Sequence, residues 1–211
     1  MDDKNRYSVP ENEDYEPGSN NEVLRNLLGI KDKETIEQIE GKELERVGNE
    51  LPGLYGPDHQ FTALDIQQIH ELWLADIYPF AGQYRTVNMS KGGFQFAASF
   101  LIDKLIQELE TKFLNQYTPC KFNGDELTYA LGIVHVELII IHPFREGNGR
   151  VSRLLANLMA MQAGFPQLNF EPIDKTENTD GFNRYIEAIH AGFDGNYQPI
   201  KQVFAKILNA S

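Results

Sequence analysis

A histidine, an acid and several arginines lie close together between two largely apolar stretches of this chain. Residues 142–153 read His-Pro-Phe-Arg-Glu-Gly-Asn-Gly-Arg-Val-Ser-Arg. Four aliphatic residues precede this segment, and the pattern of residues 150–161 is typical of a helix. Backbone N–H groups at the start of a helix, loosened by glycine, bind anions, and arginines beside them favour phosphate. The segment therefore predicts a phosphate-binding loop.

Two side chains of this loop could do chemistry on a bound phosphate. His142 has the side chain that most often serves as a general base near neutral pH. Glu146 offers hard carboxylate oxygens, which Mg²⁺ prefers when it also bridges phosphates. Phe144 should point into the core and fix the loop, which explains an aromatic residue among polar ones.

The rest of the loop could hold the anion. Gly147 and Gly149 flank Asn148 and permit positive φ and close approach of the backbone. Arg150 and Arg153 are three residues apart on the first turn of the expected helix and so share one face. An anion cradle, a metal ligand, charged side chains and a base are the parts that phosphoryl or nucleotidyl transfer requires. The spacing matches neither a His-Glu-x-x-His zinc site nor a Walker or dinucleotide-binding loop.

The composition is that of one ordinary globular domain without nucleic-acid or membrane partners. The chain has 211 residues, of which 41% are hydrophobic and 24% charged. Its formal net charge of −12 argues against a nucleic-acid footprint and favours a small anion at the arginine-rich loop. No apolar stretch is long enough to span a membrane, and the acidic start does not resemble a secretory signal. With a single cysteine, Cys120, no internal disulfide is expected, and a cytoplasmic location is predicted.

Hydrophobic periodicity predicts an all-α fold, in one domain, with a single β-hairpin. Residues 1–20 are polar and acidic and should form a flexible arm without a core of its own. Residues 23–28 should form one short amphipathic turn, and Thr35 is expected to cap a helix that ends before a break at Pro52. The expected helices cover residues 35–50, 62–78, 100–117, 127–141, 150–161, 180–191 and 199–208. Residues 84–89 should be extended, and the glycine pair that follows Lys91 predicts a hairpin. Because an isolated hairpin adds little to a core, this one suggests a function.

The central loop resembles the signature of the Fic family, His-x-Phe-x-Asp/Glu-Gly-Asn-Gly-Arg-x-x-Arg, with every fixed position filled. Residues 26–30, 80–85 and 90–97 also resemble segments of that family, and the last is similar to the flap that covers the nucleotide. The resemblance extends over roughly residues 20–205. It implies a helical Fic domain over residues 21–211 with its core at about 62–205.

The resemblance also implies an activity, the transfer of AMP from ATP to a Ser, Thr or Tyr hydroxyl of a target protein. In that scheme His142 is the general base and Glu146 binds Mg²⁺. The implied nucleotide-binding residues are Gly147, Asn148, Gly149, Arg150, Arg153 and, on the adenine side, Tyr185. The implied target-binding residues of the flap are Lys91, Gly92, Gly93, Phe94, Gln95 and Phe96, which would pair with an extended target segment through the backbone.

Other activities stay open within this resemblance. Doc kinases resemble Fic proteins but carry lysine at the position of Gly149, so the glycine favours AMP transfer over kinase chemistry. The alternatives are a Doc-like kinase, another transferase of phosphate-containing groups, or a module that binds nucleotide or a partner without turnover.

The means of inhibition is also open. Many family members carry an inhibitory helix with Ser/Thr-x-x-x-Glu-Gly/Asn, whose glutamate pairs with the second arginine of the signature, here Arg153. The stretch from Thr35 to Glu40 has one residue too many, and that from Thr176 to Asp180 ends in aspartate. We therefore expect either a separate antitoxin that supplies the glutamate or no inhibition. The resemblance further suggests a bacterial protein, with a secreted effector as the alternative to a cytoplasmic one.

Overall fold

The computed structural model describes residues 15–211. Most of the predicted arm, residues 1–14, lies outside the described residues. Its described end forms a turn that packs on the chain that follows it. Tyr15 bridges to Leu24, and the Glu16 N–H donates to the Val23 carbonyl at 2.8 Å. This turn leads toward the first helix.

Within residues 15–211 the fold is helical with one two-stranded hairpin, as the sequence predicts. The helices are α1 (Lys33–Leu54), α2 (Ala63–Leu74), α3 (Ile102–Leu109), α4 (Asn115–Tyr117), α5 (Gly124–Ile141), α6 (Asn148–Gln162), α7 (Thr179–Phe193) and α8 (Gln198–Ala210). Short 3₁₀ turns, η1 (Ser99–Leu101) and η3 (Glu171–Ile173), and a π-helical turn, η2 (Glu110–Leu114), complete the helical elements.

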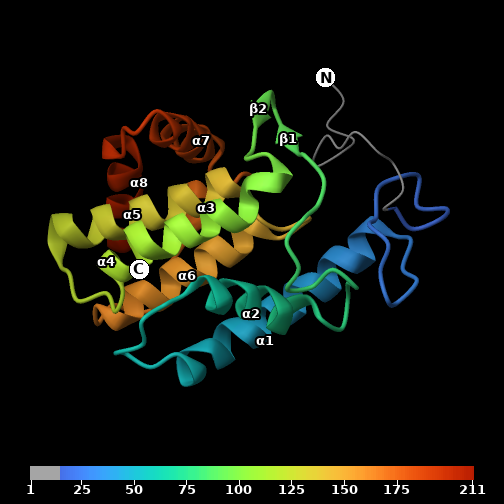
Figure 1. Cartoon of the computed structure of the whole chain (residues 1–211), viewed down its shortest axis with the longest axis horizontal. Coiled ribbons are helices and arrows are strands. Elements are labelled where there is room, and N and C mark those ends of the chain that lie inside the picture. Colours follow the sequence, from blue (N-terminus) through green and yellow to red (C-terminus); the bar gives the residue numbers. More distant parts are fainter. Residues whose placement is uncertain (1–14) are drawn as a thin grey trace.

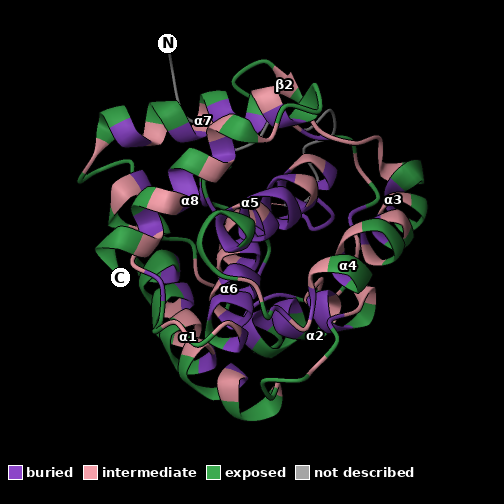
Figure 2. Cartoon of the chain, turned by 90° about the vertical axis from the view of Figure 1, so that its left-hand side faces the viewer, coloured by how far each residue is buried: buried purple, intermediate pink, exposed green. Residues whose placement is uncertain are grey.

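Helix α5 is the centre of the molecule. It packs against α8, α6, α7 and α3 (Figure 1). Its residues are buried on all sides rather than along one stripe. Figure 2 shows the buried residues gathered along α5 and α6 and on the inner faces of the surrounding helices. A helix that is apolar all round belongs in the middle of a core. The central loop joins α5 to α6 and is therefore held between two buried elements.

Helices α1 and α2 form a layer against α6 (Figure 1). Thr62 caps α2 in a reciprocal capping box with Asp65, which fixes where this helix begins. Helix α1 begins earlier than predicted, because the side chain of Asp32 rather than Thr35 is its N-cap and accepts from the Thr35 N–H at 2.8 Å. The same helix continues through Pro52, where a break was expected.

The hairpin consists of β1 (Ser90–Lys91) and β2 (Phe94–Gln95), in which Lys91 faces Phe94 and Ser90 faces Gln95. Gly92 and Gly93 have φ of 57° and 83°, the pair of positive angles that a type I′ turn requires. The prediction of a hairpin at this place is confirmed. Residues 84–89, which should be extended, lie outside both strands: Tyr84 makes an isolated bridge to Phe144, and the Met89 carbonyl accepts from the Phe96 N–H at 3.1 Å.

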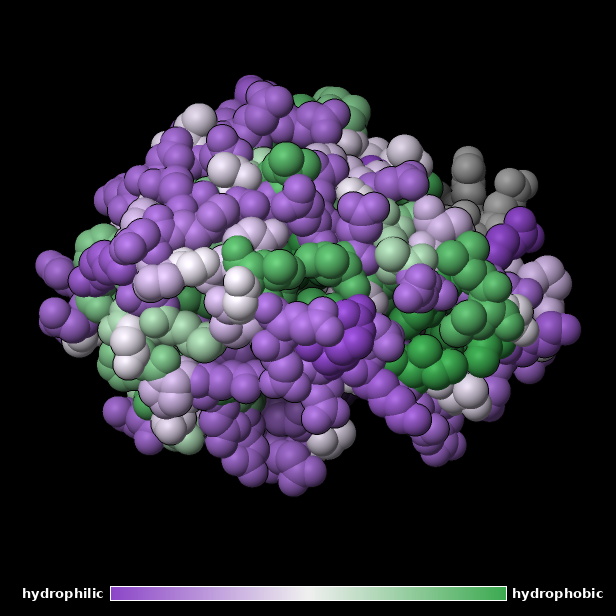
Figure 3. Space-filling view, turned by 90° about the horizontal axis from the view of Figure 1, so that it is seen from below, coloured by the Kyte–Doolittle hydropathy of each residue, from purple (hydrophilic) through white to green (hydrophobic). Residues whose placement is uncertain are grey.

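Figure 3 shows the face on the side of α1 and α2, which is mostly hydrophilic but carries one group of hydrophobic residues near its centre and a larger hydrophobic patch at the right of the view. Among the described residues, no helix combines the length and the apolar character that crossing a bilayer demands. Cys120, the sole cysteine of the chain, is buried.

Candidate active site

The central loop begins and ends in left-handed backbone. His142 closes α5 with φ 51° and ψ 59°, and its N–H still donates to the Leu138 carbonyl. Gly147, with φ 83°, precedes α6. A Cβ on Gly147 would lie 2.5 Å from Cζ3 of Trp73, so only glycine fits here. The loop thus reverses the chain within a few residues and presents the first turn of α6.

The side chains of Asn148 and Phe144 stabilise the conformation of the loop. Asn148 is buried and bonds both ways to Phe144, since it accepts from the Phe144 N–H at 2.8 Å and donates to its carbonyl at 2.7 Å. The ring of Phe144 is fully buried and stacks on His70 at 3.9 Å. The predicted inward position of Phe144 is therefore confirmed. Asn148 would contribute its backbone N–H to an anion, because its side chain is already bonded within the loop.

His70 supports the loop from α2. The Gly82 N–H donates to its Nδ1 at 2.8 Å, so Nε2 carries the ring proton and donates to the Glu146 carbonyl at 3.1 Å. Burial lowers the pKa of His70 to about 4. The residue is neutral at pH 7, and both ring nitrogens hold backbone groups.

Arg85 joins the loop to the hairpin. Its guanidinium donates to the carbonyls of Ile141 and His142 and to those of Val87 and Ala97 on either side of the hairpin. The Arg85 N–H also donates to the Pro143 carbonyl at 2.8 Å. Burial lowers the pKa of this arginine to about 10, so it remains charged at pH 7. The hairpin and the loop are thus fixed relative to each other by one side chain.

His142 is held as a neutral imidazole in one tautomer. Its Nδ1 lies 3.0 Å from the Ile139 carbonyl, which can only accept, so Nδ1 carries the proton and Nε2 presents the basic lone pair. The ring is stacked under Phe96 of the hairpin, with centroids 3.7 Å apart. Burial lowers the pKa of His142 to about 3. The imidazole is therefore neutral throughout the physiological range.

Glu146 and Arg150 are paired across the first turn of α6. Nη2 of Arg150 lies 3.2 Å from Oε1 of Glu146, and the Gly147 N–H donates to the same oxygen at 2.8 Å. The guanidinium lies over the ring of Trp73 at 4.4 Å. Arg150 also contacts a residue outside the loop, Glu40, at 2.6 Å. These contacts hold a carboxylate at the N-terminal end of α6, where it can serve as an oxygen ligand.

Arg153 lies one turn further along α6 and faces another environment. Its guanidinium is 5.5 Å from the ring centre of Phe170, and its Nε is buried with no hydrogen-bond partner within residues 15–211. A buried N–H of this kind is a candidate contact for a ligand oxygen. Arg150 and Arg153 therefore differ, because the first is bonded to carboxylates and the second is not paired with one in the described structure.

Tyr185, the implied adenine-side residue, lies in the core between α5 and α7. It is 6% exposed, and its hydroxyl bonds to Nε2 of His135 at 2.9 Å. Burial lowers the pKa of His135 to about 3, so this ring is neutral as well. The contact of Tyr185 with adenine stays a prediction.

The hairpin is attached to two parts of the molecule. Phe96 covers His142, and Phe94 stacks on His190 of α7 at 5.0 Å and meets Phe193 edge-on at 5.4 Å. The turn of the hairpin, which precedes both rings in the chain, is exposed at Lys91, Gly92 and Gly93. It offers a short edge to which an extended peptide could bond.

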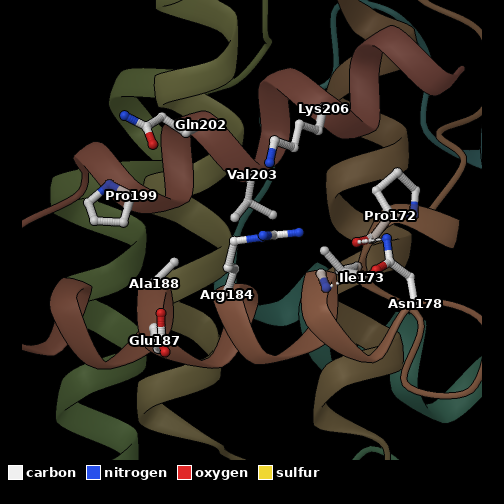
Figure 4. Close-up of a pocket in the computed structure, with 11 residues that line it drawn as sticks. Pro172, Ile173, Asn178, Arg184, Glu187, Ala188, Pro199, Gln202, Val203 and Lys206 are labelled. Carbon is white, nitrogen blue, oxygen red and sulfur yellow. Dashed lines mark hydrogen bonds between the residues drawn. The ribbon is translucent and has the colours of Figure 1, made fainter.

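A separate cavity of about 420 Å³ lies between α7, α8 and η3. The side chains of Arg184 and Lys206 extend toward its middle, beside the apolar side chains of Ile173 and Val203 (Figure 4). None of its lining residues belongs to the central loop or to the hairpin. It is therefore distinct from the site around His142.

The structure brings most of the predicted site residues together and adds others. His142, Glu146 and the two arginines lie at one junction, beneath the hairpin that the sequence singled out. The supporting residues Glu40, His70, Trp73 and Arg85 were missed. The sequence contained a signal for Glu40, because this acidic residue lies at helical spacing from the apolar residues that form the buried face of α1.

The fold and the site define a class of protein, a helical domain with a glycine- and arginine-containing loop beneath a hairpin. Residues 60–160 match the model of the Fic/DOC family. The crystal structure of BepC from Bartonella tribocorum, which contains AMPPNP, superposes with a TM-score of 0.70 at 26% identity and covers 87% of this chain and 91% of that one. This chain belongs to the Fic/DOC family.

Curated relatives extend the match beyond the loop. The probable protein adenylyltransferase Fic of Escherichia coli is 28% identical over 196 residues, which cover 89% of this chain and 88% of that protein. The protein adenylyltransferase VbhT of Bartonella schoenbuchensis is 28% identical over 162 residues, 74% of this chain. This chain spans only 32% of the length of VbhT.

Proposed function

We propose that this chain is an enzyme, a protein adenylyltransferase that moves AMP from ATP to a hydroxyl side chain of a target protein. The observation that carries the proposal is the neutral His142, with its basic Nε2, at the junction of an anion-binding helix end and a hairpin. The relatives named as adenylyltransferases and the AMPPNP in BepC support it.

His142 would take the proton of the target hydroxyl as its oxygen attacks the α-phosphorus of ATP. The bond from that phosphorus to the bridging oxygen breaks, and pyrophosphate leaves. The Nδ1–H bond to the Ile139 carbonyl keeps the ring in the tautomer that this step needs. A general base must be neutral before it acts, and burial keeps His142 so at physiological pH.

The first turn of α6 would hold the phosphates. Helix α6 begins at Asn148, and the Arg150 N–H already donates to the Gly147 carbonyl at 3.0 Å, so the N–H groups of Asn148 and Gly149 are those that would meet a phosphate. Gly149 has no heavy atom within 4 Å of an added Cβ, which leaves room beside these N–H groups. Arg153, with its buried Nε, would bind the phosphate tail and Arg150 would add positive charge.

Glu146 is the residue that would hold Mg²⁺. It is a buried carboxylate at the anion-binding end of α6, and no cluster of three or more His, Cys, Asp or Glu suited to a metal occurs in residues 15–211. One carboxylate together with substrate phosphates is the usual way in which proteins hold Mg²⁺. When bound there, the ion would neutralise the charge that develops on the phosphates.

The hairpin would bind an extended segment of the target and place its Ser, Thr or Tyr next to His142. The exposed backbone at Gly92 and Gly93 suits pairing with a strand of any sequence.

Inhibition would come from a separate antitoxin that supplies a glutamate to Arg153. The proposed location is a bacterial cytoplasm, with a secreted effector as the alternative.

Two labelled nucleotides test this function. The protein is incubated with a lysate, Mg²⁺ and ATP labelled on either the α- or the γ-phosphate. Label transferred to protein from α only is the expected result. Transfer from γ only would indicate a kinase, and no transfer with either label would indicate a binding module.

A further inference from the structure

A buried carboxylate from outside the loop reaches its first arginine. Glu40 lies on α1, 110 residues before Arg150, and is 3% exposed. Its Oε2 accepts from Nη1 of Arg150 at 2.6 Å. The remaining buried residues of α1 are apolar, so a charge on this face requires an explanation.

The surroundings of Glu40 are built to hold this charge. Its Oε1 accepts from the hydroxyl of Tyr78 at 2.6 Å, and its backbone carbonyl accepts from the indole of Trp73 at 2.9 Å. That indole also lies under the guanidinium of Arg150. A carboxylate this deeply buried is tolerated only when paired and hydrogen-bonded, and here both oxygens are bonded.

Arg150 consequently bridges two carboxylates. One of its terminal nitrogens bonds to Glu40 and the other to Glu146. If Arg150 were paired with Glu146 alone, the two side chains would have no net charge and would attract a divalent cation only weakly. With Glu40 included, the three side chains carry a net charge of about −1 at the end of α6.

We propose that Glu40 is a positioning residue: it fixes Arg150 against Trp73 and offsets its charge, so that the end of α6 where Glu146 lies attracts the divalent cation that accompanies the nucleotide. This inference rests on the proposed function, since it concerns nucleotide and Mg²⁺ at the same site. It differs from the inhibitory pairing expected at Arg153, because Glu40 contacts the other arginine. Residues that orient a ligand of a metal often matter almost as much as the ligand itself.

The test compares ATP binding with and without Mg²⁺, by calorimetry on the full chain. The variant Glu40→Gln keeps the shape of the side chain and removes its charge. The control Glu37→Gln makes the same change at an exposed position of the same helix. A third variant, Tyr78→Phe, removes one hydrogen bond to Glu40 and keeps every charge.

In Glu40→Gln, the Mg²⁺ concentration for half-maximal ATP binding should rise about tenfold. This is the lower end of the loss in metal affinity that follows when a residue supporting a metal ligand is changed. ATP binding in EDTA should be no weaker than in the unaltered protein, because a negative charge near the phosphates has gone. Tyr78→Phe should shift the Mg²⁺ requirement in the same direction by less, and Glu37→Gln should not shift it.

An unchanged Mg²⁺ requirement in Glu40→Gln would overturn the proposal. Equal weakening of ATP binding with Mg²⁺ and in EDTA would overturn it too, because that pattern indicates general damage to the site. Thermal unfolding of each variant identifies such damage independently. Because the test measures ATP binding, it decides the role of Glu40 whether or not the protein transfers AMP. A protein that binds MgATP but transfers no AMP would refute the proposed function alone.

Discussion

The ring of Phe96 lies nearly parallel to the imidazole of His142, with an angle of 15° between their planes. The hairpin that would bind the target therefore also covers the base that would activate it. This contact accounts for part of the burial that lowers the pKa of His142 to about 3. Movement of the hairpin and the basicity of His142 should be coupled for that reason.

Removal of the Phe96 ring should expose His142 to water. In Phe96→Ala the pKa of His142 should rise from about 3 toward the 6.5 of an unperturbed histidine, because burial is the largest cause of the depression. An NMR titration of the ring measures the change. Phe100→Ala, which removes an aromatic ring that is 83% exposed, is the control. An identical titration of His142 in both variants would contradict this account.

The folded protein should lose stability as the pH falls below about 6.5. Burial lowers the pKa of His135 and His142 to about 3 and that of His70 to about 4. Between those values and about 6.5 the unfolded chain binds protons that the folded chain does not, so acid favours unfolding. Each such histidine contributes a slope of about 1.4 kcal/mol per pH unit at most.

The variant His135→Asn isolates one of these contributions. Between pH 6 and 4.5 its free energy of unfolding should depend less on pH than that of the unaltered chain, by about 1.4 kcal/mol per unit. Urea unfolding over this range measures the slope. Leu158→Ala, which shortens a buried side chain that does not titrate, should lower stability without altering the slope. A His135→Asn slope equal to that of the unaltered protein would refute the interpretation.

The two glycines of the loop should differ in what they tolerate. Gly147→Ala places a Cβ 2.5 Å from Trp73 at a φ of 83°, and should cost about 2–4 kcal/mol of stability. Gly149→Ala meets no atom within 4 Å and lies in α6, so it should change stability by less than about 1 kcal/mol. Denaturant unfolding compares them, and equal losses would show that Trp73 does not restrict the loop.

The parts of the site that are local in sequence could be predicted from it. The loop residues, the hairpin turn at Gly92-Gly93 and the capping box at Thr62 depend on near neighbours. The contacts of Glu40 and Arg85 could not be predicted, because they join segments 110 and 57 residues apart. The start of α1 was misplaced because Asp32 and Thr35 are both good capping residues, and only the fold decides between them.

The central claim is tested most directly by mass spectrometry of proteins incubated with this chain, ATP and Mg²⁺. The account predicts an AMP group on a Ser, Thr or Tyr side chain of a protein. It also predicts that His142→Ala forms no such adduct although it still binds ATP, because the variant loses the base and keeps the phosphate site. An equal yield of the adduct with His142→Ala, or a phosphate in place of AMP, would contradict it.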